Sequence, residues 1–204
     1  LDCSGLTQWA YAQQGVEIDL LTYGQGQDVA IPGVRLIRIP RFGIRTIKVG
    51  PSALKAFFDL FMIIWTIALL LRRRYDFVHA HEEAVFYCRF LKPLFRFKLI
   101  YDMHSSLPQQ LTNFRFTTSK LLIGLFSVLE RTSLRAADAV ITICPDLADY
   151  VLKEGVDSKR HFLIENSIFD DVVLAGGQGT GREDQAPAAL EQGGPLVVYA
   201  GTFE

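Results

Sequence analysis

The stretch FVHAHEE (residues 77–83), followed after a helical interval by KLIYDMHSS (residues 98–106), decides the fold of this chain. Each half is a short apolar run that ends directly in polar residues, a pattern that is typical of a buried strand. A strand–helix–strand unit of this length crosses over right-handed and places its two strands parallel. Ligands of open α/β sheets bind beside the carboxyl ends of such strands. We therefore expect His81 and His104 to face the same crevice.

The rest of the chain alternates strands and helices in the same way. Further strands are predicted at residues 16–22, 33–39, 139–143 and 161–165, and helices at residues 6–14, 52–73, 119–136 and from residue 145 onward. The strand at residues 16–22 alternates apolar and polar residues, which indicates a half-buried strand. Together these elements predict an α/β protein with a doubly wound, mostly parallel Rossmann-like sheet.

Composition changes sharply at residues 175–194, where Ala, Gly, Gln and Pro dominate and bulky apolar residues vanish. Such a segment is typical of a flexible linker. We therefore predict a first domain over residues 1–168, a linker over residues 169–194 and the start of a second Rossmann-like domain over residues 195–204. The apolar run LVVYA (residues 196–200) would be the first strand of that second domain. Because the sequence opens without Met and stops just after this strand, we expect a fragment of a longer protein.

Half of the 204 residues are apolar, and the formal net charge is −1. A chain of this composition can bury a large core, which excludes a disordered protein. The lack of a basic excess argues against a dedicated nucleic-acid binder. Cys3, Cys88 and Cys144 are odd in number, far apart and set in apolar surroundings. This pattern predicts reduced thiols in a cytoplasmic protein rather than a disulfide framework.

The predicted helix at residues 52–73 is apolar over almost the length that spans a membrane. Its polar residues Lys55, Asp59, Thr66 and Arg73 fall within one narrow arc at about 100° per residue. We interpret this stripe as the wet edge of a helix that packs on the sheet, with Lys55 and Asp59 paired at i,i+4. A membrane span and interfacial binding are the alternatives.

A basic segment precedes this helix, and RRR (residues 72–74) follows it. The segment contains five cations and no acid, namely Arg35, Arg38, Arg41, Arg45 and Lys48. Such a surface can contact anionic lipid or a phosphorylated acceptor. The alternative is an ordinary solvated edge.

The histidines also raise the alternative of a metal site. His79 and His81 form an HxH motif, and Glu82, Asp102 and His104 could add ligands. A catalytic metal would need further ligands from later strand ends, and the sequence offers none, so we expect no metal site. His79 lies inside a strand and is interpreted as structural. His81 and His104 lie at strand ends and are the better functional candidates, with strand capping as the alternative.

Several segments, taken in order, resemble the N-terminal domain of family-4-type glycosyltransferases with the GT-B fold. They are FVHAHE (residues 77–82), YDMH (101–104), LERTSLRAADAVIT (129–142), CPDL (144–147) and VVYAGTFE (197–204). The last of these is similar to the first strand and phosphate-side loop of the C-terminal domain in that family. The resemblance covers nearly the whole chain.

The resemblance implies a retaining hexosyltransferase that moves a sugar from a nucleotide-diphosphate donor to an acceptor hydroxyl without a required metal or other cofactor. The acceptor would be a glycan or a lipid-linked molecule in cell-envelope or exopolysaccharide synthesis. The protein would be cytoplasmic, with peripheral contact to an anionic membrane as an option. The matching positions imply catalysis by His104, acceptor binding by His81, Glu82, Ser105 and Ser106, and donor binding by Gly201 and Thr202.

The sequence also departs from the family pattern. The first strand with its glycine-bearing loop and most of the donor domain are absent, so we expect this chain alone to be inactive. Asn166-Ser167-Ile168 replaces a glycine turn. The alternative functions are a noncatalytic Rossmann-like nucleotide-binding module and a membrane-surface module. The donor sugar, the acceptor and the oligomeric state stay open.

Overall fold

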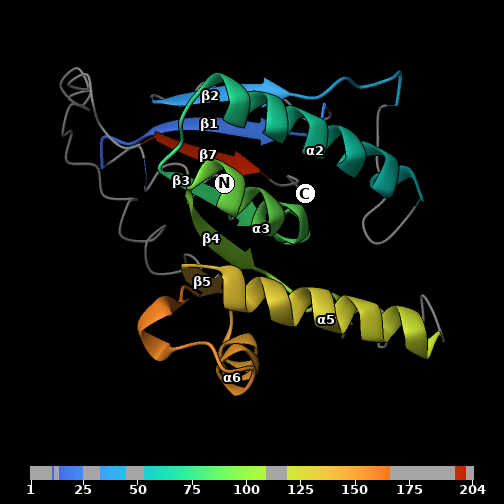
Figure 1. Cartoon of the computed structure of the whole chain (residues 1–204), viewed down its shortest axis with the longest axis vertical. Helices are drawn as coiled ribbons and strands as arrows, with labels where there is room; N and C mark the ends of the chain where they lie inside the picture. Colours follow the sequence, from blue (N-terminus) through green and yellow to red (C-terminus); the bar gives the residue numbers. More distant parts are fainter. Residues whose placement is uncertain are drawn as a thin grey trace, which may run out of the picture.

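The fold is a seven-stranded sheet in which all neighbouring strands run parallel, in the order β2-β1-β7-β3-β4-β5-β6 (Figure 1). The computed structural model describes residue 11 and residues 14–24, 33–44, 53–108, 119–165 and 196–200. The strands are β1 (Glu17–Thr22), β2 (Val34–Arg38), β3 (Phe77–His81), β4 (Lys98–Met103), β5 (Ala139–Thr142), β6 (His161–Leu163) and β7 (Leu196–Ala200). The predicted α/β class and parallel Rossmann-like sheet are confirmed.

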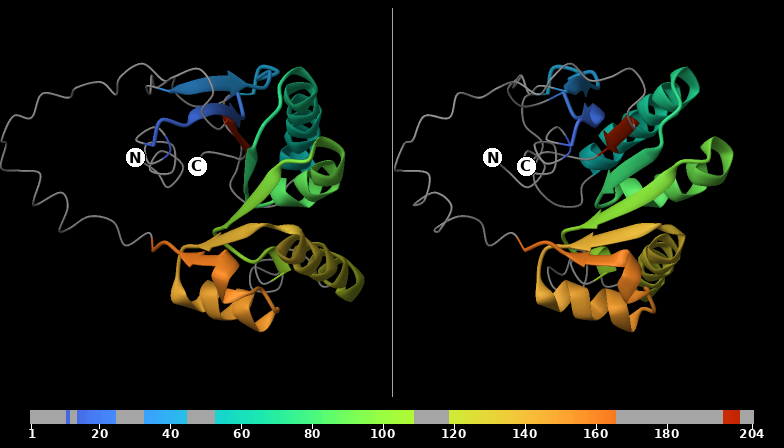
Figure 2. Two further views of the ribbon diagram at one scale, coloured as in Figure 1. Left: turned by 60° about the vertical axis from the view of Figure 1, so that its left-hand side comes forward. Right: turned by 90° about the vertical axis from the view of Figure 1, so that its left-hand side faces the viewer.

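Helices join the strands. They are α2 (Ala53–Arg72), α3 (Ala84–Phe95), α5 (Lys120–Ala136) and α6 (Pro145–Lys153), with a 3₁₀ helix at Ser158–Arg160. Helices α2, α3 and α5 cover the same face of the sheet, and α6 packs at the end formed by β5 and β6 (Figure 2). The hydroxyl of Ser119 caps α5 by accepting from the Leu122 amide at 3.4 Å.

The order of the strands makes the sheet doubly wound. From β1 the chain moves outward to β2 at one edge, whereas from β3 it moves through β4 and β5 to β6 at the other edge. The two directions of winding separate beside β3. In such sheets, the carboxyl ends of the strands at this point form the usual ligand site. The residues that follow β3 and β4 are therefore the candidates for a ligand site.

β7 takes a different place from the one predicted. It was expected to open a second domain, but here it lies in the centre of the sheet and pairs with both β1 and β3. Val197 and Val198 are fully buried there. The physical reason is that β1 and β3 each present a parallel edge, and an apolar strand between them satisfies the backbone groups of both. The predicted boundaries at residues 168 and 194 lie outside the described residues, and that division stays a prediction.

β1 is also more buried than its sequence suggested. Alternation predicted a half-buried strand, yet every residue from Ile18 to Thr22 is buried. Strands inside a parallel sheet are typically covered on both faces, so burial overrides the alternating pattern. The buried Asp19 is neutralised locally, because Arg35 Nε donates to its carboxylate at 2.7 Å and the Tyr75 hydroxyl donates to it at 2.5 Å.

The described arginines of the predicted basic segment bond to residues in β1 or directly after it. Arg38 donates to the carbonyl of Tyr23 at 3.1 Å, and Arg41 donates to the carbonyl of Gly24. With Arg35 bound to Asp19, these side chains tie the segment around β2 to β1. Arg45 and Lys48 lie outside the described residues. Structural bonding therefore accounts for the three described cations of this segment.

Helix α2 packs on the sheet as predicted, but Lys55, Asp59 and Thr66 of its polar stripe face inward, whereas Arg73 is exposed. The stripe was expected at a wet edge. Instead, Thr66 is fully buried and donates to the carbonyl of Met62 at 2.8 Å. Lys55 pairs with Asp59 at 3.7 Å, as predicted, and with Glu83 at 2.9 Å. The three side chains on the helix face inward because they find partners there, so the apolar residues are turned outward.

The outward arc of α2 is apolar along its length. Phe57, Leu60, Ile64 and Leu71 are all exposed. Residues Leu54–Arg72 form the single helix of the described residues that is long and apolar enough to cross a membrane. Phe58 and Met62 on its inner side belong to the core shared with β3, β4 and α5, which fixes α2 to the sheet.

Candidate active site

The predicted meeting of His81 and His104 is present in the structure. His81 is the last residue of β3 and is paired in register with Asp102 of β4, and His104 follows β4 directly. The centroids of the two imidazole rings lie 4.3 Å apart, with an angle of 61° between the ring planes. The parallel pairing of β3 and β4 thus brings both histidines to the carboxyl edge of the sheet.

Asp102 holds this group together. Its side chain is buried, with one carboxylate oxygen 3.2 Å from His104 Nε2 and the other 3.1 Å from His79 Nε2. Burial alone would raise the pKa of Asp102, but the hydrogen bonds from His104 and His79 outweigh burial and hold this pKa well below its usual range. An ionised carboxylate can only accept hydrogen bonds, so both histidines donate from Nε2.

His79 extends the hydrogen-bond chain into the core. It is fully buried, and its Nδ1 lies 3.1 Å from the hydroxyl of Tyr11. Because the Tyr11 phenol carries a proton and His79 Nε2 donates to Asp102, the Tyr11 hydroxyl is assigned as the donor to His79 Nδ1. Burial, followed by the charge of Asp102, raises the pKa of Tyr11 to about 12, so the phenol keeps its proton. These contacts agree with the structural role predicted for His79.

His81 differs from His104 in its charge state. Burial, followed by the proximity of His104, lowers the pKa of His81 to about 3. The imidazole of His81 is therefore neutral at neutral pH. His104 lies nearer the surface, and its Nε2 contacts the ionised Asp102. The site thus places a neutral imidazole beside one that can carry positive charge.

Glu82 adopts a strained backbone at the end of β3. Its φ angle is +47°, in the left-handed region that non-glycine residues seldom occupy. The Glu82 amide donates to the carbonyl of Asp102 at 3.0 Å. Ser105 Oγ donates to the carboxylate of Glu82 at 3.2 Å. Burial and then Glu83 raise the pKa of Glu82. Strained residues of this kind are frequent at functional sites, and the acceptor-binding role of Glu82 stays a prediction.

Ser106 was predicted to bind the acceptor, but its side chain is buried and bonded within the protein. It is buried, and its hydroxyl donates to Glu130 at 2.9 Å. The next residue, Leu107, donates its amide to the other carboxylate oxygen of Glu130 at 3.1 Å. Ser106 therefore anchors the loop after β4 to α5, and Ser105 is the serine of this loop that contacts Glu82.

Glu130 is the site residue that sequence reasoning missed. Its side chain is fully buried in α5 and also accepts from the Tyr150 hydroxyl at 2.6 Å. Burial raises its pKa, although its three donors act in the opposite direction. The available signal was its spacing: Glu130 shares a helix face with the buried Ser133 and Leu134. Glu130 fixes the position of the loop that carries His104 and Ser105.

The donor side of the predicted site is only partly visible. Gly201 and Thr202 lie outside the described residues. The strand before them is described, and its last residue, Ala200, pairs with Ala80 of β3. The chain therefore leaves β7 at the same edge of the sheet as His81.

Three of the possible metal ligands that the sequence offered lie close together in the structure. Donor atoms of His81, Asp102 and His104 all lie within 4.8 Å of one another. Imidazole nitrogen and carboxylate oxygen are donors that zinc accepts in proteins. Both oxygens of Asp102 already accept hydrogen bonds from histidines, so a metal would have to replace the contact with His104.

Comparison with protein families agrees with this geometry. Residues 8–167 match the glycosyl transferase 4-like domain, so the chain belongs to this family of glycosyltransferases. The matched range includes Asp102 with its partners His79 and His104, and it also includes Glu130. The parallel sheet is consistent with the N-terminal half of a GT-B glycosyltransferase. No curated protein matches the chain.

Replacing Glu130 with Ala will lower the free energy of unfolding by about 2–4 kcal/mol, because buried Ser106 and the part-buried donors of Leu107 and Tyr150 lose their acceptor. Chemical denaturation followed by circular dichroism measures the change. Asp149→Ala, at an exposed acid of α6, is the matched control and should change stability little. Equal effects of the two substitutions would contradict the anchoring role of Glu130.

Replacing His81 with Asn will flatten the acid sensitivity of stability. Below about pH 6.5, the unfolded chain binds a proton at residue 81 that the folded chain with its lowered pKa does not bind. Stability therefore falls as the pH falls, and the wild type should lose up to about 2 kcal/mol more than the variant between about pH 6.5 and 4.5. Denaturant midpoints across this range test the difference. A variant as acid-sensitive as the wild type would refute it.

Proposed function

We propose that the protein is a retaining glycosyltransferase that moves a sugar from a nucleotide-diphosphate donor to an acceptor hydroxyl. The observation that carries the proposal is the contact between buried Asp102 and His104 at the carboxyl edge of a glycosyltransferase domain. The acceptor is a glycan or a lipid-linked molecule of cell-envelope or exopolysaccharide synthesis. The enzyme works in the cytoplasm, at the inner face of an anionic membrane, and we assign the activity to the full-length protein.

The role of His104 follows from the charge that develops in sugar transfer. As the bond between sugar and donor breaks, negative charge builds up on the leaving phosphate. An imidazolium held by Asp102 would stabilise that charge or donate a hydrogen bond to the sugar. Because Asp102 and the loop anchored by Glu130 orient the ring beforehand, little reorganisation is needed when the substrate binds.

The neighbouring residues suit the acceptor side. His81 is neutral and can hydrogen-bond a hydroxyl without binding a proton itself. Glu82 and Ser105 already contact each other and offer an acceptor and a hydroxyl at the same edge. Gly201 and Thr202, next after β7, are proposed to contact the donor pyrophosphate, because glycine lets the backbone approach phosphate closely.

We propose that catalysis needs no metal ion. Asp102 has both oxygens occupied by histidine donors, and a metal at this group would take away the His104 ring that the proposed chemistry uses. The charge of the leaving phosphate would be balanced by His104 and by donor-side groups.

Replacing His104 with Ala in the full-length protein will reduce kcat by about 100-fold or more, because the charge of the leaving group loses its stabilising partner. A screen of nucleotide-diphosphate sugars first defines the donor that the wild type uses, and product formation is then followed by chromatography. His161→Ala, at the histidine of β6 that contacts Thr142, is the matched control and should retain most turnover. Near-normal turnover of His104→Ala, with circular dichroism unchanged, would remove His104 from catalysis.

Removing divalent ions will leave turnover unchanged. The assay is the same transfer reaction after dialysis against EDTA and 1,10-phenanthroline, with and without added zinc or magnesium. Loss of activity that returns on adding either metal would contradict the metal-free proposal and would point to the His81, Asp102 and His104 donors.

A further inference from the structure

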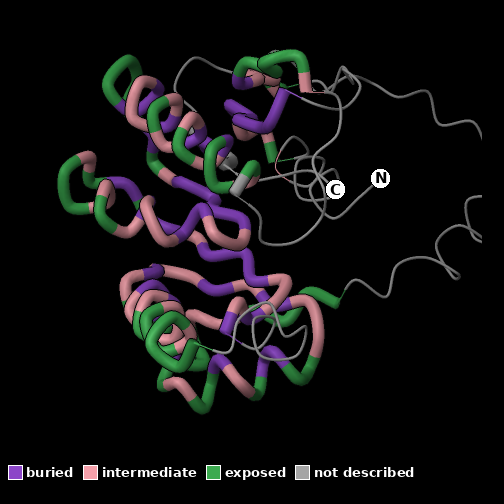
Figure 3. Tube along the Cα trace, turned by 90° about the vertical axis from the view of Figure 1, so that its right-hand side faces the viewer, coloured by how far each residue is buried: buried purple, intermediate pink, exposed green. Residues whose placement is uncertain are grey.

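Three helices turn apolar residues outward on the same face of the sheet. The most exposed are Leu71 on α2 at 72%, Leu94 on α3 at 73% and Leu121 on α5 at 86%. Others are Phe57, Leu60 and Ile64 on α2, Phe90 on α3, and Leu125 and Val128 on α5. Figure 3 shows that exposed residues follow the outer turns of these helices. We call this surface the helical face.

The arrangement of α2 makes this exposure difficult to explain for a face in water. Its polar residues Lys55, Asp59 and Thr66 form contacts on the inner side, whereas its outer arc carries only apolar side chains from Phe57 to Leu71. A surface helix in water shows the reverse pattern. Large exposed apolar surfaces in soluble proteins mark contact with a partner or a membrane.

A cluster of cations adjoins the end of this face. A cavity of about 1120 Å³ opens where α2 and α3 end and β3 and β4 begin, and its lining includes Leu71 and Leu94. Four arginines line it, namely Arg72, Arg73, Arg74 and Arg96, together with Lys98 and one acid, Asp76. Exposed leucines and arginines therefore occur side by side, the combination that favours an anionic membrane surface.

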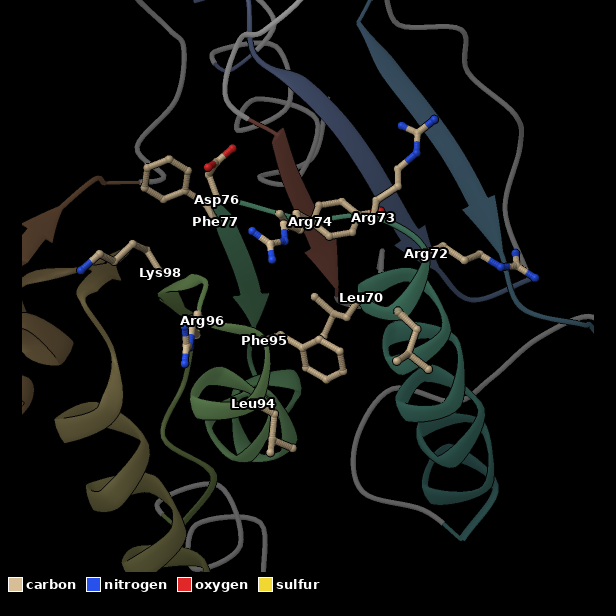
Figure 4. Close-up of a pocket in the computed structure, with 12 residues that line it drawn as sticks. Leu70, Arg72, Arg73, Arg74, Asp76, Phe77, Leu94, Phe95, Arg96 and Lys98 are labelled. Atoms are coloured by element: carbon tan, nitrogen blue, oxygen red, sulfur yellow. The ribbon is translucent and has the colours of Figure 1, made fainter.

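The directions of the arginine side chains favour a membrane over a single bound phosphate. Figure 4 shows Arg72 and Arg73 pointing to one side of the cavity, whereas Arg74 and Arg96 lie on the side of β3 and α3. A site for one phosphate would converge its cations on a single point. Side chains spread around a rim instead match headgroup phosphates spread over a surface. Complementing the negative end of a helix explains Arg72 in the last turn of α2, but not the whole cluster.

We propose that the helical face docks on an anionic bilayer, with its leucines in the interface and the arginines of the cavity contacting lipid phosphates. Helix α2 remains packed on the sheet, because crossing the bilayer would expose Lys55 and Asp59 to hydrocarbon. Since Lys55 contacts Glu83 beside the site and Arg72 lines the cavity, α2 extends from one edge of the sheet to the other. The docked surface therefore reaches the edge that carries His104. Docking does not depend on the proposed activity.

Vesicle sedimentation tests the proposal without an assay of transfer. The purified protein should sediment with vesicles of phosphatidylcholine mixed with phosphatidylglycerol, and high salt should release it. Arg73→Gln/Arg74→Gln should weaken partitioning about 30-fold, which corresponds to two arginines near an anionic surface. Lys153→Gln/Lys159→Gln removes two exposed cations at α6 and the 3₁₀ helix after it, and should bind like the wild type.

The apolar part is tested separately. Leu71→Gln should weaken binding to the mixed vesicles, whereas Leu152→Gln, at an exposed leucine of α6, should not. Equal binding to pure phosphatidylcholine, equal effects of the arginine and lysine pairs, or retention after alkaline carbonate extraction would each overturn the proposal. So would a stable dimer by light scattering that Leu71→Gln dissociates, because the face would then cover a second copy.

Discussion

The buried carboxylate of Asp102 is the constraint on which the rest of the site depends. An ionised group this far from water persists only with strong partners, and here His79 and His104 supply them from two sides. His79 is fixed in turn by Tyr11, so a single charge orders residues from the start of the described chain to the loop after β4. The parallel pairing of β3 and β4 makes this possible, because it brings the residues of both strand ends to the same edge.

Helix α2 connects this site with the opposite edge of the sheet. Its first turn contacts Glu83 just after β3, and its last turn lines the basic cavity before β3. The inward polar stripe stabilises the first contact and leaves the outward arc apolar. The orientation of α2 therefore has two effects. It places Lys55 against Glu83 beside the site, and it exposes the apolar surface that is proposed to dock on a membrane. A glycosyltransferase with a lipid-linked acceptor would use both.

The sequence predicted those features that depend on local order along the chain. His81 and His104 could be placed together because both follow parallel strands. Three other features depended on tertiary contacts. Periodicity gave the arc of Lys55, Asp59 and Thr66 but could not say which side faced the sheet. The run at Leu196–Ala200 could pair with any open edge, and here it pairs with β1 and β3. The role of Glu130 depends on its contacts with Ser106 and Leu107, which local sequence order does not predict.

The most direct test of this account is the turnover of Asp102→Asn in the full-length protein. An amide keeps the shape of the side chain but removes the negative charge that His104 Nε2 contacts. We expect kcat to fall by about 100-fold or more, the Michaelis constant for the donor to change far less, and the circular dichroism spectrum to stay native. Turnover close to the wild type in a folded variant would contradict the central role of the carboxylate.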